Sequence, residues 1–460
     1  MLSFRSPGSR REFLRVGGLA LGGLTLSHLH SQAGSSLSSA ASGPLTDKCV
    51  IFLFLHGGPS QIETFDPHMD APVEIRSATG EVKTVLPGVT FGGTFPKLAA
   101  RADRFTVVRS FVTGDGNHDI KPVVGKDTAA ANLGAAYASV AGSTRSNGMP
   151  TNVALFPQAI DPACQPMQAG FGNFLASGPF GPGSVPFVPG SGGPAQKNLT
   201  LGVPQSQLGD RRTLLAAFDR ANREFDATAD GLDDTRQKAF SLLLGNAAEA
   251  FDLKTEDPKT VAKYDTEPLF DVTKIDKKWN NKKYYTDNAR TLGKLLLLAR
   301  RLAERGAGFV TVTTNFVWDM HADANNATMT EGMGYMAPGL DHAVSTFLDD
   351  LKDRGLSDKI LLVACGEMGR TPKINKNGGR DHWGDLAPLL LAGGGLKMGQ
   401  VIGQSSRDGG RPSSDPIKIP NLLSTIAHTM FDVGKLRVTR GVGREVLSLA
   451  DAAPIPGLHG

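Results

Sequence analysis

Acidic and imidazole side chains follow three short apolar runs of this chain. His56 follows the run at 48–55, Asp319 follows the run at 309–314, and Glu367 follows the run at 360–365. Runs of this length and composition predict buried parallel strands. Because the carboxyl ends of such strands meet at one edge of an open sheet, we expect these side chains to converge there. Carboxylates and imidazoles gathered at such an edge can bind a divalent cation.

The spacing of Asp319 and His321 supports the same interpretation. The two residues are two positions apart, so in an extended segment both side chains point the same way. Ligation by imidazole and carboxylate suits zinc, whereas calcium prefers more oxygen ligands and fewer imidazoles. The pattern therefore indicates a divalent cation, most consistent with zinc, and leaves the number of cations open.

Helix and strand patterns alternate along the segments that must position these residues. A helical stripe at 288–305 precedes the run at 309–314, and another at 340–355 precedes the run at 360–365. Helix followed by strand is the crossover unit of a parallel sheet. The sequence therefore predicts an α/β fold, a doubly wound and mostly parallel sheet with helices on both faces.

Two segments interrupt this alternation. Residues 156–204 are dense in Pro and Gly, which predicts an ordered irregular loop or lid. Apolar residues then recur at helical spacing, and we expect a helical insertion over 205–285.

The first residues resemble an export signal. Arg10 and Arg11 precede an apolar run of about 14 residues and a tail of small residues, the pattern of a twin-arginine signal peptide over 1–42. The run is shorter than a membrane span. We expect export to the periplasm or beyond and no stable membrane span after the leader is cleaved, with an uncleaved amphipathic anchor as the alternative.

Composition limits the partners. The chain of 460 residues has a formal net charge of +4, and residues 1–42 carry four Arg and one Glu, so the remainder is close to neutral. This balance gives no support to nucleic-acid binding. The three cysteines, Cys49, Cys164 and Cys365, are too few for a disulfide framework, and we interpret them as small buried hydrophobic residues.

Three motifs carry a family resemblance. They are HGGPSQIETFDP at 56–67, WDMHAD at 318–323, and GEMGRTPKIN followed by GRDHWGDLAPLLLAGGG between 366 and 395. In this order they closely resemble an exported bacterial family, domain of unknown function 1501, which is placed with the alkaline phosphatase and sulfatase superfamily of metal-dependent hydrolases. The resemblance covers nearly everything after the leader and implies an alkaline phosphatase-like α/β domain over 43–460.

The resemblance also implies ligand roles. Asp319 and His321 match the Asp/His strand end of the superfamily, Glu367 matches the next acidic strand end, and His382 matches the final histidine. The first strand departs from the pattern, because His56 stands where an acid should follow directly. Four further candidate ligands are His56, Glu63, Asp66 and His118. For His118, a loop histidine bonded to its neighbours is an equal alternative.

A phosphatase or sulfatase also needs a nucleophile and an oxyanion partner. Ser60 is our preferred nucleophile over Thr64, because a glycine-rich turn would present it to the site; the alternative is that Ser60 only stabilises this turn. Arg370 could bind a phosphate or sulfate oxygen in a bidentate manner. Its alternative is an ion pair with Glu367 or Asp381 that shapes the loop.

Two functions follow as expectations. The first is an exported metal-dependent hydrolase of a phosphate or sulfate ester, acting on a small molecule or a polymer-linked anionic ester. The second is a catalytically altered exported binding or cell-envelope assembly protein on the same scaffold. The missing acid after the first strand favours the second, and the sequence identifies no protein partner.

Overall fold

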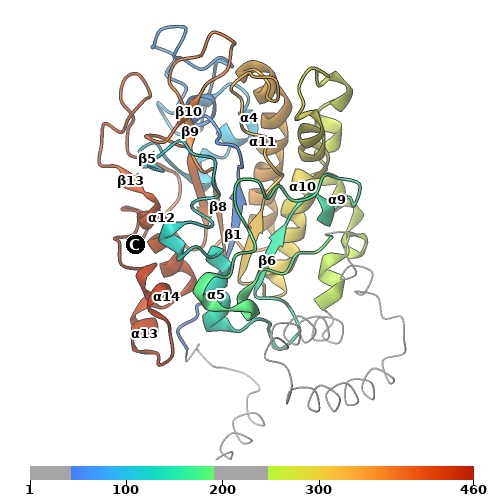
Figure 1. Ribbon diagram of the computed structural model, residues 1–460, viewed down its shortest axis with the longest axis vertical. Coiled ribbons are helices and arrows are strands. Elements are labelled where there is room, and N and C mark those ends of the chain that lie inside the picture. The colour runs from blue at the N-terminus through green and yellow to red at the C-terminus, as the bar shows by residue number, and fades with distance from the viewer. Residues whose placement is uncertain (1–42, 191–246, 460) are drawn as a thin grey trace, which may run out of the picture. The chain divides into compact units, whose positions relative to one another are not determined.

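The computed structural model describes residues 43–190 and 247–459 (Figure 1). The predicted leader, the end of the predicted lid and most of the predicted helical insertion lie outside these residues. From Pro44 onward the chain forms a single unit built around one central sheet.

The central sheet has seven strands in the order β12-β4-β11-β8-β1-β7-β6. Their bounds are β1 Cys49–Phe54, β4 Thr106–Val108, β6 Asn152–Leu155, β7 Phe309–Val312, β8 Ile360–Cys365, β11 Leu389–Gly393 and β12 Gln400–Ile402. Strand β1 pairs in parallel with β7 and β8, and β6 pairs in parallel with β7. Strand β11 is antiparallel to its neighbours β8 and β4. Since the other pairings of the sheet are parallel, the sheet is mostly parallel, as predicted.

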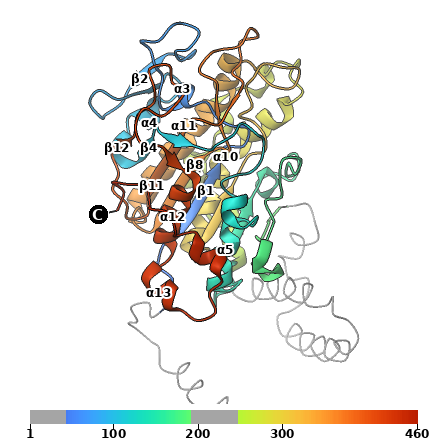
Figure 2. The same ribbon diagram turned by 60° about the vertical axis from the view of Figure 1, so that its left-hand side comes forward.

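Helices cover both faces of this sheet (Figures 1 and 2). Helices α10 (Lys282–Glu304) and α11 (Met329–Asp353) pack together on the face that carries Ile51 and Leu53 of β1. Helices α5 (Leu133–Ala141) and α12 (Ile419–Met430) pack on the opposite face, with Val50 and Phe52. Alternate residues of a strand point to opposite faces, so two covered faces require the uninterrupted apolar run of β1. The predicted α/β architecture is confirmed.

Smaller elements surround the sheet. The remaining strands are β2 Glu81–Lys83, β3 Thr90–Gly92, β5 Phe111–Val112, β9 Gly369–Arg370, β10 His382–Trp383 and β13 Ile417–Lys418. The remaining α-helices are α3 Gln61–Thr64, α4 Pro96–Ala99, α9 Pro258–Tyr264, α13 Val433–Val438 and α14 Arg444–Ser448. The three cysteines are buried and free, in agreement with their predicted apolar role.

The two segments expected to interrupt the alternation are described in part. Residues 157–190 hold three short 3₁₀ turns and no longer element. Between 247 and 281 the chain forms 3₁₀ turns and the seven-residue helix α9, and the long helix α10 begins at Lys282. No helix among the described residues is long and apolar enough to cross a membrane.

Candidate metal centre

The carboxyl ends of β1, β7 and β8 lie side by side, and the turn after β1 draws the segment after β7 against it. Gly57 has φ +111°, and a Cβ placed on it would lie 2.6 Å from the backbone nitrogen of Asp319. The carbonyl of His56 accepts hydrogen bonds from the backbone N–H groups of Val317 and Trp318, each at 3.1 Å. Glycine at 57 therefore permits the approach that fixes Asp319 at this edge.

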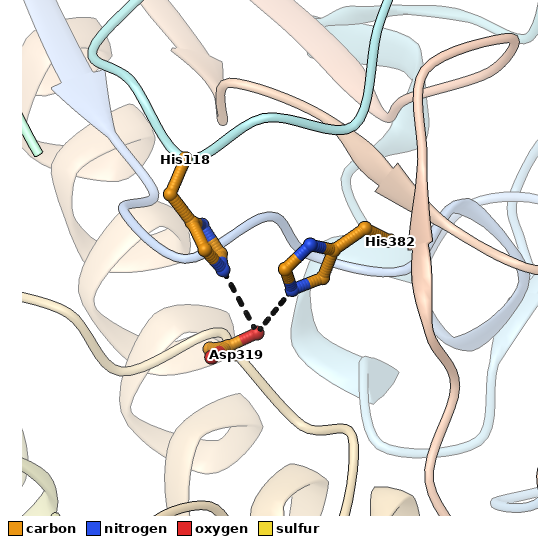
Figure 3. A group of neighbouring side chains, drawn as sticks. All are labelled: His118, Asp319 and His382. Carbon is orange, nitrogen blue, oxygen red and sulfur yellow. Dashed lines mark hydrogen bonds and ion pairs between the residues drawn. The ribbon is translucent and has the colours of Figure 1, made fainter.

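Asp319 is the centre of a cluster of imidazoles (Figure 3). Its Oδ1 lies 3.4 Å from Nε2 of His118 and 3.3 Å from Nε2 of His382. Figure 3 shows both rings pointing at this one oxygen from different segments. The other oxygen, Oδ2, lies 3.0 Å from Nε2 of His321. Three histidines thus share one carboxylate.

Two further side chains hold this carboxylate in place. Nη2 of Arg370 donates to Oδ1 of Asp319 at 2.6 Å, and Nδ2 of Asn326 donates to Oδ2 at 3.0 Å. The amide oxygen of Asn326 accepts in turn from Nδ2 of Asn281 at 2.7 Å, which fixes the orientation of the amide. The local sequence around Asn326 does not signal this arrangement, because Asn281 lies 45 positions earlier in the chain.

Glu367 is the second carboxylate of the site, and it contacts the cluster through His118. Its carboxylate is fully buried and accepts from the backbone N–H of Gly57, at 2.9 and 3.1 Å. Its Oε1 lies 3.1 Å from Nδ1 of His118. The ring of His118 therefore bridges the two carboxylates of the site, Glu367 on one nitrogen and Asp319 on the other.

The positions of the histidines depend on a contact between two loops. Strands β9 and β10 pair antiparallel and place His382 opposite Arg370. The backbone N–H groups of Thr113 and Gly114 donate to the carbonyl of Gly384, which holds the loop of His118 against this hairpin. At Gly116, a Cβ would lie 3.0 Å from the Cβ of His382.

The charges of the site oppose the cost of burial. Burial alone would raise the pKa of Asp319, but the Arg370 guanidinium and hydrogen bonds from the imidazoles lower it, so the carboxylate is ionised. Burial would lower the pKa of His118, but Asp319 and Glu367 together raise it. The hydrogen bond to Asp319 raises the pKa of His321. The cluster thus stabilises positive charge.

His56 sits beside this cluster in apolar surroundings. It is 1% exposed, and its ring contacts Phe54, Phe171, Phe174 and Phe316. Burial lowers its pKa to about 4, so the ring is neutral at pH 7. Neither ring nitrogen has a hydrogen-bond partner among the described residues.

Glu63 and Asp66 have other partners. Glu63 is fully buried and accepts from Nη2 of Arg380 at 2.8 Å and from the hydroxyl of Ser77 at 2.8 Å. Asp66 pairs with Arg109 at 3.2 Å and, in a cluster that also contains Ser405, with His68 at 3.1 Å. These carboxylates connect loops through hydrogen bonds and ion pairs, and none of their described contacts is with Asp319.

Ser60 and Arg370 are also engaged in ways that differ from the preferred predictions. Ser60 is 2% exposed and its Oγ accepts from the backbone N–H of Glu63 at 3.3 Å, the N-cap bond of α3. Arg370 is fully buried and donates to the carbonyls of Gly57 and Gly58 as well as to Asp319. The ion-pair partner of Arg370 is therefore Asp319. The sequence had suggested that Arg370 binds an ester oxygen or, alternatively, pairs with Glu367 or Asp381.

One group among the described residues has the composition and spacing to hold a metal ion. His118, Asp319 and His382 each offer one ligand atom, and these atoms all lie within 4.8 Å of one another. Two imidazole nitrogens and one carboxylate oxygen form a donor set that suits zinc and leaves room for a further ligand. The predicted ligands Asp319, His321 and His382 meet directly, and Glu367 joins them through His118.

The family described as "Protein of unknown function (DUF1501)" matches residues 47–447. No curated protein sequence matches the chain.

Three similar solved structures share 10–12% sequence identity with the chain. The lipoteichoic acid synthase LtaP from Listeria monocytogenes aligns over 92% of this chain and 81% of its own, with 10% identity and a TM-score of 0.27. The phosphonate monoester hydrolase SpPMH from Silicibacter pomeroyi aligns over 83% and 73%, with 12% identity and a TM-score of 0.32. The lipooligosaccharide phosphoethanolamine transferase A from Neisseria meningitidis aligns over 97% and 68%, with 10% identity and a TM-score of 0.29.

Proposed function

The chain belongs to the DUF1501 family of proteins of unknown function, and we propose that it is a metal-dependent hydrolase of phosphate or sulfate esters. One observation carries the proposal: His118, Asp319 and His382 present three ligand atoms within 4.8 Å of one another. They do so at the carboxyl edge of a parallel sheet, where α/β proteins build their sites.

The donor set fits a divalent cation, with zinc preferred. Two imidazoles and a carboxylate match the three protein ligands of catalytic zinc sites, in which substrate or water takes a fourth position. The side chain of His382 is 35% exposed and that of His118 only 13%, so the cluster opens on the side of His382. A bound cation would polarise the ester and lower the pKa of an attacking water molecule.

The residues of the chain itself hold the site in order. Arg370 and Asn326 fix the two oxygens of Asp319, and Glu367 fixes the ring of His118. Such outer contacts hold a metal ligand in position and set which ring nitrogen of a histidine carries the proton. The site is therefore organised before any substrate binds.

The charge of the site suits an anionic ester. Asp319 and Glu367 contribute two negative charges and Arg370 one positive charge, so one divalent cation would leave a net charge of about +1. A phosphate or sulfate group would be attracted to that excess, whether on a small molecule or on a polymer.

A second candidate, an exported binding or cell-envelope assembly protein, is favoured by a different observation. Ser60 is buried as a helix cap, and the guanidinium of Arg370 is committed to Asp319 and four backbone carbonyls. The side chains expected to attack the ester and to receive its oxyanion are thus otherwise engaged. On this alternative, the protein would bind an anionic polymer without cleaving it.

Turnover of aryl phosphates and aryl sulfates by purified protein separates the two candidates. We expect wild-type protein to lose activity in chelator and to regain it with zinc, and His382→Ala to have no activity in either condition. His342→Ala is the matched control, because His342 contacts Lys97 and Lys263 instead of Asp319. Loaded protein that binds these esters and turns over none of them would contradict the hydrolase and support the binding protein.

Export by the twin-arginine route is part of the proposal and rests on the sequence of residues 1–42. Replacing Arg10 and Arg11 by Lys is expected to leave the protein in the cytoplasm, measured by fractionation and immunoblotting. Unchanged export of the double variant would count against this route.

A further inference from the structure

The ring of His118 connects Glu367 to Asp319. Oε1 of Glu367 lies 3.1 Å from Nδ1 of His118, and Nε2 of the same ring lies 3.4 Å from Oδ1 of Asp319. A neutral imidazole carries one N–H and one lone pair. If Nδ1 carries the hydrogen and donates a hydrogen bond to the carboxylate of Glu367, the lone pair of Nε2 points toward Asp319.

Nε2 of His118 is buried, and its contact with Oδ1 of Asp319 at 3.4 Å does not have the geometry of a hydrogen bond. A buried nitrogen without a partner is costly, so its position next to the carboxylate of Asp319 points to a ligand held between them. Metal sites often contain a carboxylate that is hydrogen-bonded to a metal-binding histidine. The carboxylate orients the imidazole ring and makes its other nitrogen a more basic ligand for the metal.

Glu367 is poorly placed to be a ligand itself. Both of its oxygens are within hydrogen-bond distance of the Gly57 N–H, at 2.9 and 3.1 Å, and the side chain has no exposed surface. Its carboxylate is held by the N–H of Gly57 and by His118, and it does not belong to the group of ligand atoms that lie within 4.8 Å of one another. The turn after β1 is tightly packed, because a Cβ on Gly58 would lie 2.5 Å from Cγ of Met368.

The charge count favours one cation over two. With Asp319 and Glu367 negative and Arg370 positive, one divalent ion would leave about +1, whereas two would leave about +3 at a buried site. His118, Asp319 and His382 are also the only group of this kind within residues 43–190 and 247–459.

We infer that the centre binds one divalent cation per chain through His118, Asp319 and His382, and that Glu367 is a positioning residue acting through His118. The inference rests on the proposed metal-dependent function, and it gives Glu367 a different role from the direct ligation expected from the sequence. It differs from a paired-metal site in stoichiometry and in the role of one carboxylate.

Metal content of purified, folded protein tests this inference without a substrate. Protein dialysed against zinc is expected to retain one ion per chain by plasma emission spectrometry, and His118→Ala is expected to retain none. Glu367→Gln should still bind one ion at saturating zinc, with an affinity about 10–100-fold weaker in a chelator competition. ¹⁵N NMR of the ring nitrogens should show the Nδ1–H of His118 in the wild type bonded to an acceptor.

Asp341→Asn is the matched control, because Asp341 is also a buried carboxylate that accepts from backbone N–H groups, those of Lys97 and Leu98. Its metal content and affinity should match the wild type. Two ions per chain, or a Glu367→Gln variant as empty as His118→Ala, would overturn the inference. One ion per chain without ester turnover would instead overturn the proposed hydrolase, and wild-type protein that binds no ion would overturn both.

Discussion

Replacing Arg370 by Met removes a buried guanidinium while keeping much of the apolar length of the side chain. Nη2 of Arg370 lies 2.6 Å from Oδ1 of Asp319, and the guanidinium also donates to the carbonyls of Gly57 and Gly58. Arg370 is 0% exposed and Asp319 is 3% exposed. The substitution therefore leaves a buried carboxylate without its charged partner and removes a donor from four backbone carbonyls.

The expected cost follows from this burial. Removing one partner of a buried ion pair costs about 3–5 kcal/mol, since the remaining charge stays buried and uncompensated. We expect Arg370→Met to lower the free energy of unfolding by about this amount in chelator, a large part of the roughly 5–15 kcal/mol of a typical domain. With zinc present the loss should be smaller, because a bound cation would take the place of the guanidinium as the positive partner of Asp319.

Urea unfolding followed by tryptophan fluorescence, with chelator and with zinc, measures both effects. Arg411→Met is the control, because the side chain of Arg411 is 76% exposed and its pair with Asp385 spans 3.4 Å. It should change stability by no more than about 0.5 kcal/mol. A loss below about 1 kcal/mol for Arg370→Met in chelator, the value of a surface pair, would refute the buried-pair reasoning.

Three further predictions concern the surroundings of the site and the stability of the fold. Ser60→Ala should cost about 1 kcal/mol of stability, as the loss of a helix cap does, and should keep ester turnover; loss of all turnover from folded protein would restore Ser60 as the nucleophile. Gly57→Ala should cost at least about 1–2 kcal/mol, because φ is +111° and the added Cβ would lie 2.6 Å from the nitrogen of Asp319; unchanged denaturant midpoints would contradict it. Hydrogen bonding from Arg101 lowers the pKa of Asp349 below 3.8, so this pair stabilises the fold above pH 3.8 and the contribution is lost as pH falls further. Asp349→Asn should therefore flatten the acid side of the stability profile in urea titrations, and an unchanged profile would count against the pairing.

The sheet could be predicted because its central strands are buried on both faces. The runs at 48–55, 309–314 and 360–365 contain no charged residue after Lys48, and they form β1, β7 and β8, which are neighbours in the sheet. The direction of β11 could not be predicted, since an apolar run does not indicate whether its partner is parallel or antiparallel.

The site was predicted less completely, because its geometry depends on loops. Asp319 and His321 follow one strand at a spacing that brings both to the same point, and the structure has them in contact. The place of His118 depends on the bond between the loop at 113–118 and the carbonyl of Gly384, a contact between segments distant in sequence. The roles of these residues as ligands stay predictions.

Arg370 and Ser60 show a different limit. Both residue types occur in catalytic sites and in structural ones, and the difference lies in burial and partners. Arg370 lies where three segments meet, and its guanidinium donates to carbonyls on each of them, those of Gly57 and Gly58, Trp318, and Arg380. Ser60 precedes a helix of only four residues, too short to stand out in the sequence. For Arg and Ser, the role can be assigned only when the burial and the hydrogen-bond partners of the side chain are known.

Anomalous diffraction from crystals of the purified protein, recorded on both sides of the absorption edge of the metal that copurifies, would locate the cation directly. We expect one peak per chain, bound by Nε2 of His118, Oδ1 of Asp319 and Nε2 of His382, with Glu367 outside bonding distance. A fully loaded crystal with no peak beside Asp319, or with its peak at another group of residues, would contradict the metal centre and the hydrolase built on it.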